Sequence, residues 1–79
     1  MKLTLYSRHG CHLCEDMIEL LSELMQDHVF ELDIIDIDDD PGLVSRFNDL
    51  VPVLMLAEHE ICRFFLDQKT LLDTLDKTD

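Results

Sequence analysis

Residues 6–14 read YSRHGCHLC, and within this stretch the hydrophobic pattern changes from that of a strand to that of a helix. Lys2–Tyr6 alternates between polar and apolar residues, which is typical of a short strand. From Cys11 onward, apolar residues recur every three or four positions, which predicts a helix with one apolar face that ends near Asp27. Residues 7–10 are therefore expected to form the turn that joins the two.

The rest of the chain continues this alternation of strands and helices. Strands are predicted where apolar residues alternate with polar ones or run continuously, at 2–6, 29–37, 53–57 and 61–66, with a hairpin connection at 58–60. The run at 53–57 is apolar throughout, as expected of a strand buried on both faces. Later helices are expected after Asp40, which can cap a helix that starts at Pro41, and after Asp67. The predicted order is βαβαββα, an α/β fold in one domain covering residues 1–79.

Composition and charge narrow the classes of function. Hydrophobic residues make up 47% of the 79, a share typical of globular proteins, and no apolar run approaches the roughly 20 residues of a membrane-spanning helix. The N-terminus lacks the apolar core of a secretory signal, so we expect a cytoplasmic protein, and we expect it to be a monomer. Six basic and eighteen acidic side chains give a net charge of −12, which disfavours nucleic acid and anionic membranes as partners. The charge favours solubility or attraction to a basic partner protein.

Two cysteines three positions apart, Cys11 and Cys14, are the main chemical signal of the sequence. A CxxC pair at a turn from strand to helix can close a small disulfide ring, and such a pair within a βαβ pattern is typical of redox proteins. Cys11 would lie at the helix N-terminus, where free backbone N–H groups and the helix dipole favour the nucleophilic thiolate. Cys14 would point toward the helix body, be less exposed and react second. The neighbouring Arg8, His9 and His12 supply the main cluster of positive charge in this acidic chain.

Two other functions stay open at this point. His9, Cys11, His12 and Cys14 are all potential metal ligands, but zinc sites usually combine two separated pairs of ligands. We therefore expect no metal within one chain, whereas a metal or an iron–sulfur cluster shared by two chains is an alternative. A non-catalytic adaptor that binds a partner through its acidic surface is another. The third cysteine, Cys62, is expected to be a small buried residue of the fourth strand, and a third redox thiol is the alternative.

The stretch at 6–14, together with Leu50-Val51-Pro52-Val53, resembles the glutaredoxin-like family of the thioredoxin-fold superfamily, of which this chain would be a divergent, short member. The resemblance covers nearly the whole chain. It implies a thioredoxin-like, glutaredoxin-type fold with a four-stranded mixed sheet in the order 2-1-3-4, flanked by helices. It also implies that Cys11 is the nucleophile, that Cys14 is the resolving thiol, and that Pro52 is cis and faces the pair.

The same resemblance implies a function and a set of substrate contacts. The function is thiol–disulfide oxidoreduction on protein or small-molecule disulfides, with no cofactor required and with glutathione as a candidate reductant. We expect the partner to be a disulfide-bearing protein or glutathione, and we expect Arg8, His12, Val51 and Pro52 to contact it. Two departures from the family pattern concern glutathione. His12-Leu13 replaces the usual Pro-Tyr between the cysteines, and an apolar stretch at 61–65 replaces a Gly-Gly turn.

Overall fold

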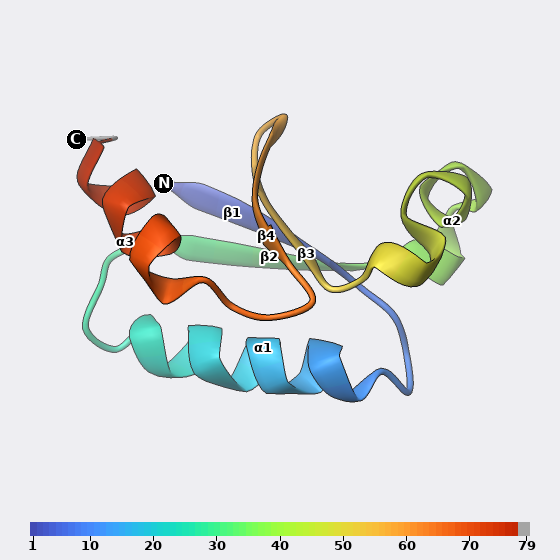
Figure 1. Ribbon diagram of the computed structural model, residues 1–79, viewed down its shortest axis with the longest axis horizontal. Helices are drawn as coiled ribbons and strands as arrows, with labels where there is room; N and C mark the ends of the chain where they lie inside the picture. The colour runs from blue at the N-terminus through green and yellow to red at the C-terminus, as the bar shows by residue number, and fades with distance from the viewer. Residues whose placement is uncertain (78–79) are drawn as a thin grey trace.

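The N-terminal strand lies inside a four-stranded sheet in the computed structural model, which describes residues 1–77 (Figure 1). This strand, β1 (Lys2–Ser7), pairs in parallel with β2 (Glu31–Asp36) and antiparallel with β3 (Val53–Leu56). The last strand, β4 (His59–Arg63), pairs antiparallel with β3, so the order across the sheet is β2-β1-β3-β4. The mixed sheet and its strand order confirm the prediction. Residues 78–79 of the predicted domain lie outside the described part.

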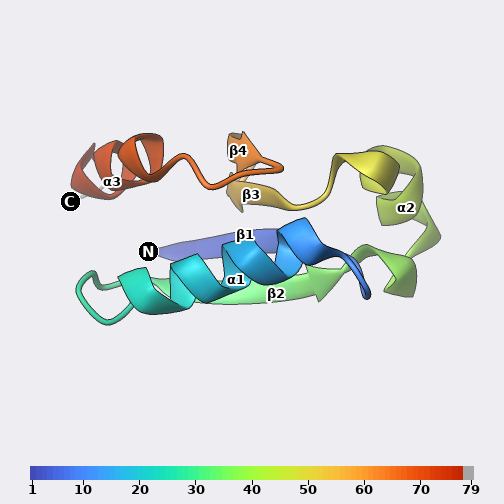
Figure 2. The same cartoon turned by 60° about the horizontal axis from the view of Figure 1, so that its bottom comes forward.

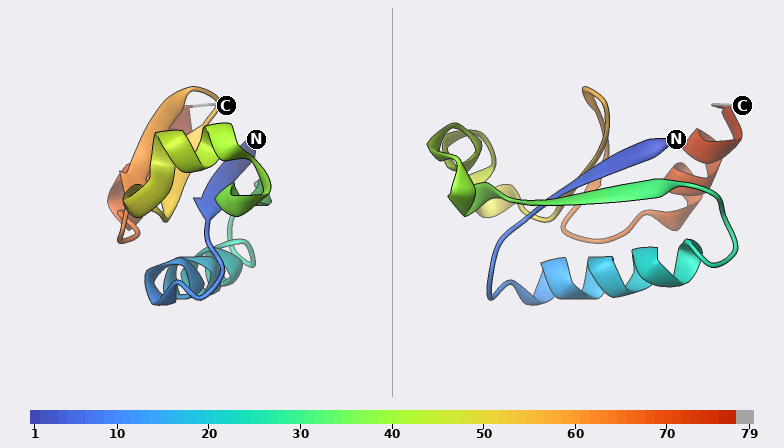
Figure 3. Two further views of the ribbon diagram at one scale, coloured as in Figure 1. Left: turned by 90° about the vertical axis from the view of Figure 1, so that its right-hand side faces the viewer. Right: turned by 180° about the vertical axis from the view of Figure 1, so that it is seen from behind.

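Three helices cover the sheet. They are α1 (His12–Leu24), α2 (Pro41–Phe47) and α3 (Gln68–Lys77), and short 3₁₀ turns, η1 (Ile37–Asp39) and η2 (Asn48–Leu50), flank α2. Figure 2 shows α1 running along β1 and β2, and the end-on view in Figure 3 shows α1 beneath the sheet and α2 across the ends of its strands. The predicted order βαβαββα is therefore confirmed. None of the helices described here is long and apolar enough to cross a membrane.

The alternation of side chains along the central strands divides the core into two clusters. Leu3, Leu5 and Leu54 point to one face, where they pack with residues of α1 and α3. Val53 and Met55 point to the other face and pack with α2 and with Cys14. Because successive residues of β3 feed different clusters, this strand is buried on both faces, as predicted. The second cluster is the one that supports the cysteine pair.

Two predicted boundaries on the β2 side were wrong. β2 begins at Glu31 rather than at residue 29, because Glu31 is paired with Lys2 at the start of β1 and no strand extends further to pair with Val29, which is 99% exposed. α1 ends at Leu24, and the chain continues to His28 in hydrogen-bonded turns instead of helix. The periodic pattern did not distinguish these turns from a last helical turn.

The fourth strand was also predicted two residues too late. Leu56 pairs with His59, so the hairpin loop contains only residues 57–58, and His59 and Glu60 belong to β4. β4 ends at Arg63 because Phe64 takes a positive φ of 66°, which turns the chain away from the sheet. A left-handed conformation is rare for a bulky residue, and the sequence carries no signal for it.

The hairpin loop yields a stability prediction. Ala57 has a φ of 53°, a conformation that disfavours any residue with a Cβ atom, and it is the first residue of a two-residue loop, where glycine is preferred. Ala57→Gly should raise the free energy of unfolding by about 0.5–1 kcal/mol, measured by urea denaturation.

Glu58→Gly is the matched control, because Glu58 is exposed and belongs to the same loop but has no positive φ. It should lower the free energy of unfolding by increasing the entropy of the unfolded chain. Equal effects of the two substitutions would contradict this account of the loop.

Candidate active site

Cys11 caps the N-terminus of α1. Its backbone is extended, with φ −100° and ψ 111°, and its carbonyl oxygen accepts a hydrogen bond from the N–H of Glu15 at 3.1 Å. Its Sγ atom accepts a hydrogen bond from the backbone N–H of Cys14 at 3.2 Å. The sulfur therefore lies at the positive end of the helix and accepts a hydrogen bond from one of the N–H groups that a helix start leaves free. This is the position at which a helix can stabilise a thiolate.

Cys14 is a buried thiol that points toward Cys11. Only 1% of Cys14 is exposed, and it packs with Ile37, Phe47 and Val53. Burial, followed by a hydrogen bond with the Cys11 side chain, raises the pKa of Cys14 to about 12. Cys14 therefore keeps its proton at neutral pH and can donate it to the Cys11 sulfur. Both cysteines are free in the structure.

The Val51–Pro52 segment lies beside the two cysteines. Its peptide bond is cis, as the resemblance implied, Pro52 is fully buried, and Val51 packs in the apolar cluster that includes both cysteines. The carbonyl oxygen of Pro52 accepts a hydrogen bond from the N–H of Phe64 at 2.9 Å. This bond places the loop between β4 and α3 next to the segment before β3. The loop therefore lies near the two cysteines.

Two exposed side chains flank this arrangement. The His12 side chain, which directly follows Cys11, is 97% exposed, and its Nδ1 atom is 3.9 Å from Oε2 of Glu15. Phe65 is 71% exposed, because the positive φ of Phe64 turns the following residue away from the core. Phe65 is not among the site residues predicted from the sequence.

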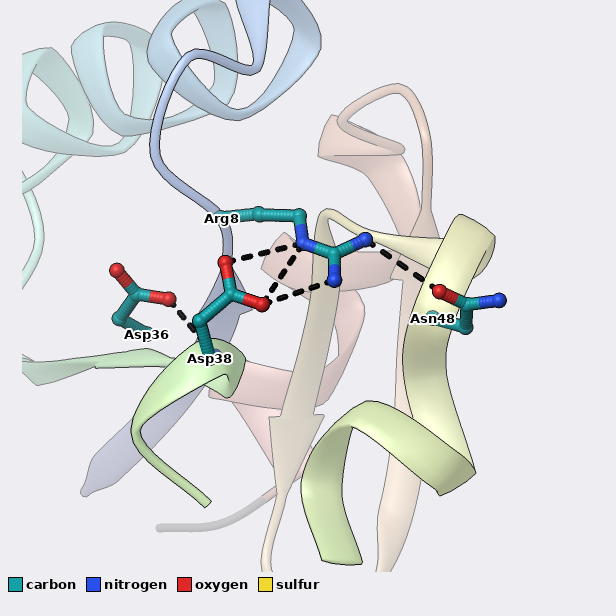
Figure 4. Close-up of polar contacts among 4 residues, drawn as sticks. All are labelled: Arg8, Asp36, Asp38 and Asn48. Atoms are coloured by element: carbon teal, nitrogen blue, oxygen red, sulfur yellow. Dashed lines mark hydrogen bonds and ion pairs between the residues drawn. The ribbon is translucent and has the colours of Figure 1, made fainter. Parts of the chain in front are cut away.

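Arg8 is held by residues far away in the chain (Figure 4). Its Nε atom donates to both carboxylate oxygens of Asp38 at 3.1 Å, and its Nη2 atom donates to Oδ1 at 2.8 Å. Its Nη1 atom donates to Oδ1 of Asn48 at 3.4 Å, and the N–H of Asp38 donates to Oδ1 of Asp36 at 2.9 Å. We call this network of Arg8, Asp36, Asp38 and Asn48 the Arg8 clamp. It joins the turn before Cys11 to η1 and η2.

The Arg8 clamp changes the interpretation of Arg8. The hydrogen bonds with Asp38 raise the pKa of Arg8 and lower the pKa of Asp38, as expected of a bidentate ion pair. The sequence predicts Arg8 to be a cation beside Cys11 and a substrate contact, whereas the structure shows its guanidinium bound to Asp38. Asp38 and Asn48 are 30 and 40 residues away from Arg8, so no sequence spacing indicated them.

A cleft of about 380 Å³ opens beside Cys14. The turn at 7–10 and Cys14 line it together with carboxylates of α1, β2 and η1. These carboxylates are Glu15, Asp36 and Asp39. The cleft is absent from the prediction because it depends on how α1 packs across β2.

Cys62 lies on β4, away from the pair. It packs against the cluster formed with α1 and α3, as expected of a small core residue, although part of its side chain reaches solvent. Burial raises the pKa of its thiol. In residues 1–77, no group of three or more histidine, cysteine, aspartate or glutamate side chains is arranged to hold a metal ion.

Comparison with known proteins decides the family. The model of the Glutaredoxin-like domain (DUF836) matches residues 2–76. The chain belongs to this glutaredoxin-like family. The chain is also similar to the uncharacterized protein Rv0508 of Mycobacterium tuberculosis. The two are 32% identical over 75 residues, which cover 89% of this chain and 77% of that protein.

Solved structures share the fold of this chain. The solution NMR structure of protein Ne2328 from Nitrosomonas europaea is 44% identical to the glutaredoxin-like chain, with a TM-score of 0.81 over 92% of this chain and 88% of the other. Thioredoxin 1 from Thermosipho africanus is 20% identical, with a TM-score of 0.65 over 99% and 98% of the two chains. The thioredoxin likeness shows a shared fold, and the fold is therefore thioredoxin-like.

The different burial of the two thiols predicts their order of modification. Iodoacetamide at pH 7 should label Cys11 at least about 100-fold faster than Cys14, because the raised pKa of Cys14 leaves almost no thiolate and its sulfur is buried. Peptide mass spectrometry after timed quenching measures both rates. In urea, which removes the burial, the two rates should agree within about threefold. Native labelling of Cys14 as fast as Cys11 would contradict the assignment of the outer and inner thiol.

Proposed function

We propose that this protein is a thiol–disulfide oxidoreductase in which Cys11 is the nucleophile and Cys14 the resolving thiol. The observation that carries the proposal is the pairing of the two sulfurs at the start of α1. Cys11 Sγ accepts the Cys14 N–H, and the buried Cys14 thiol is hydrogen-bonded to Cys11. One sulfur is thus placed to attack, and the other is placed within reach of it but shielded from solvent.

The reaction consists of two exchange steps. The Cys11 thiolate attacks one sulfur of a partner disulfide, a new sulfur–sulfur bond forms, and the other partner sulfur leaves as a thiolate. Cys14 then gives up its proton, which the departing sulfur can accept, and attacks Cys11 Sγ. The partner is released as a dithiol, reduced by two electrons, and the protein is left with a Cys11–Cys14 disulfide. An external thiol, such as glutathione or a dithiol protein, returns the pair to the reduced state.

The Val51–Pro52 segment is the proposed substrate-binding segment. Val51 packs in the cluster that holds both cysteines, and the Phe64 loop lies against Pro52, so a chain bonded to Cys11 would meet both. An extended peptide could add there by backbone hydrogen bonds. His12 is available as a further contact because its side chain is solvent-exposed. The proposed partner is a disulfide-bearing protein or glutathione, and the proposed setting is the cytoplasm, where thiol pools keep such a pair reduced.

A redox titration tests the proposal. In glutathione buffers of graded potential, metal-free protein should lose two thiols reversibly, with a midpoint between about −180 and −270 mV. Thiol trapping and mass measurement identify Cys11 and Cys14 as the pair. Absence of a disulfide at every potential would favour the adaptor. Thiols that become available only after zinc or iron is stripped would favour a metal or cluster shared by two chains.

Single substitutions separate the roles of the cysteines. Cys11→Ser should abolish disulfide reduction, because no nucleophile remains. Cys14→Ser should stop the reaction at the mixed disulfide on Cys11, visible as a covalent adduct by intact mass. Cys62→Ala is the matched control, because Cys62 lies on β4 in the other core cluster, and its turnover should stay within about twofold of the wild type. Turnover that survives Cys11→Ser would rule out the proposed mechanism.

A further inference from the structure

The arginines at the cysteine end of the molecule are already engaged by the protein itself. Arg8 is bound by Asp38, and it also faces Asp36 and Asp49, so more negative than positive charge gathers around it. Arg63 is the last residue of β4 and pairs with Val53, which directly follows Pro52. Its guanidinium donates to both carboxylate oxygens of Glu60, at 2.6 and 2.8 Å. Each guanidinium is therefore paired with a carboxylate of the protein itself.

Carboxylates without an arginine partner border the same site. Glu15 lies one turn after Cys11 on α1, and its charge is felt at Cys14. Glu15 and Asp39 line the cleft that Cys14 also lines. The remaining nearby arginine, Arg46, stacks over the Phe47 ring at 4.8 Å. The cleft beside the cysteine pair is thus lined by three carboxylates and by Arg8, whose charge Asp38 offsets, in a chain whose net charge is −12.

We propose that the site selects disulfides that carry positive charge and discriminates against anionic disulfides, glutathione disulfide included. This inference rests on the proposed function and names its substrate class as a cationic disulfide, in the cell a disulfide flanked by lysine or arginine on a basic protein. The Arg8 clamp has a direct part in this selection, because the Asp38 carboxylate offsets the charge of the cation that stands three residues before the nucleophile.

The expected size of the effect follows from surface electrostatics. Each charge pair at an exposed site changes a rate or an affinity by about two- to fivefold, and salt screens it over a Debye length of about 8 Å at physiological ionic strength. Glutathione disulfide carries a net negative charge at neutral pH, and cystamine carries two ammonium groups. Several carboxylates acting together should therefore separate these two substrates by at least about tenfold at low salt.

The experiment compares three small disulfides of different charge. Reduced protein is mixed with cystamine, with neutral 2-hydroxyethyl disulfide or with glutathione disulfide, and the second-order rate of thiol loss is measured. Each rate is divided by the rate of 2-mercaptoethanol with the same disulfide, which removes intrinsic reactivity. The expected order is cystamine, then the neutral disulfide, then glutathione disulfide, and the spread should shrink to about twofold in 0.5 M salt.

A pair of charge variants locates the effect. Asp49→Asn removes an exposed carboxylate that faces Arg8 and should raise the normalised rate with glutathione disulfide about two- to threefold. Asp73→Asn makes the same change of net charge on the exposed surface of α3, at the other end of the molecule from α2 (Figure 1), and should leave that rate unchanged. Equal effects of the two variants would show that net charge, and not the site, sets the selectivity.

The outcomes distinguish this inference from the proposed function. Equal normalised rates for cystamine and glutathione disulfide would overturn the charge selection while leaving the oxidoreductase in place, since the neutral disulfide still reacts. A preference for cystamine that persists unchanged in high salt would also overturn it. Failure of all three disulfides to react would instead contradict the proposed function.

Discussion

The hydrogen bond from the Cys14 N–H to Cys11 Sγ is the interaction on which the site depends. It starts α1, because it satisfies an N–H group that the first helical turn leaves free. It also fixes the outer sulfur at the helix terminus and places Cys14 one turn inward, against the cluster that β3 and α2 build. Secondary structure and chemistry are therefore specified by the same pair of residues, and a change at Cys11 would affect both.

The Arg8 clamp fixes the turn that precedes the cysteine pair. The turn at 7–10 contains Gly10 at a positive φ and could adopt several conformations, but the clamp binds it to η1 and η2. The guanidinium that provides this anchor is hydrogen-bonded to Asp38 and Asn48. The clamp also affects the electrostatics of the site, because the charge of Arg8 is offset by Asp38.

The sheet brings these parts together. β1 delivers the turn and the cysteines, β2 leads into η1 with Asp38, and the segment before β3 brings Val51 and Pro52. Tyr6 at the end of β1 stacks on Phe47 at the end of α2, with ring centroids 4.4 Å apart, and this contact holds α2 over the same end of the sheet. The site thus lies where strand ends from three separate stretches of sequence meet.

The sequence by itself determined the elements and the cysteine pair, because hydrophobic periodicity and helix capping act over a few residues. It predicted β1, α1 and the doubly buried β3 for this reason, and the family resemblance supplied the strand order. Only the tertiary structure decided the partner of Arg8 and the register of β4. Asp38 lies 30 residues from Arg8, and β4 takes its register from Leu56. These features depend on packing between distant segments, which leaves no local pattern in the chain.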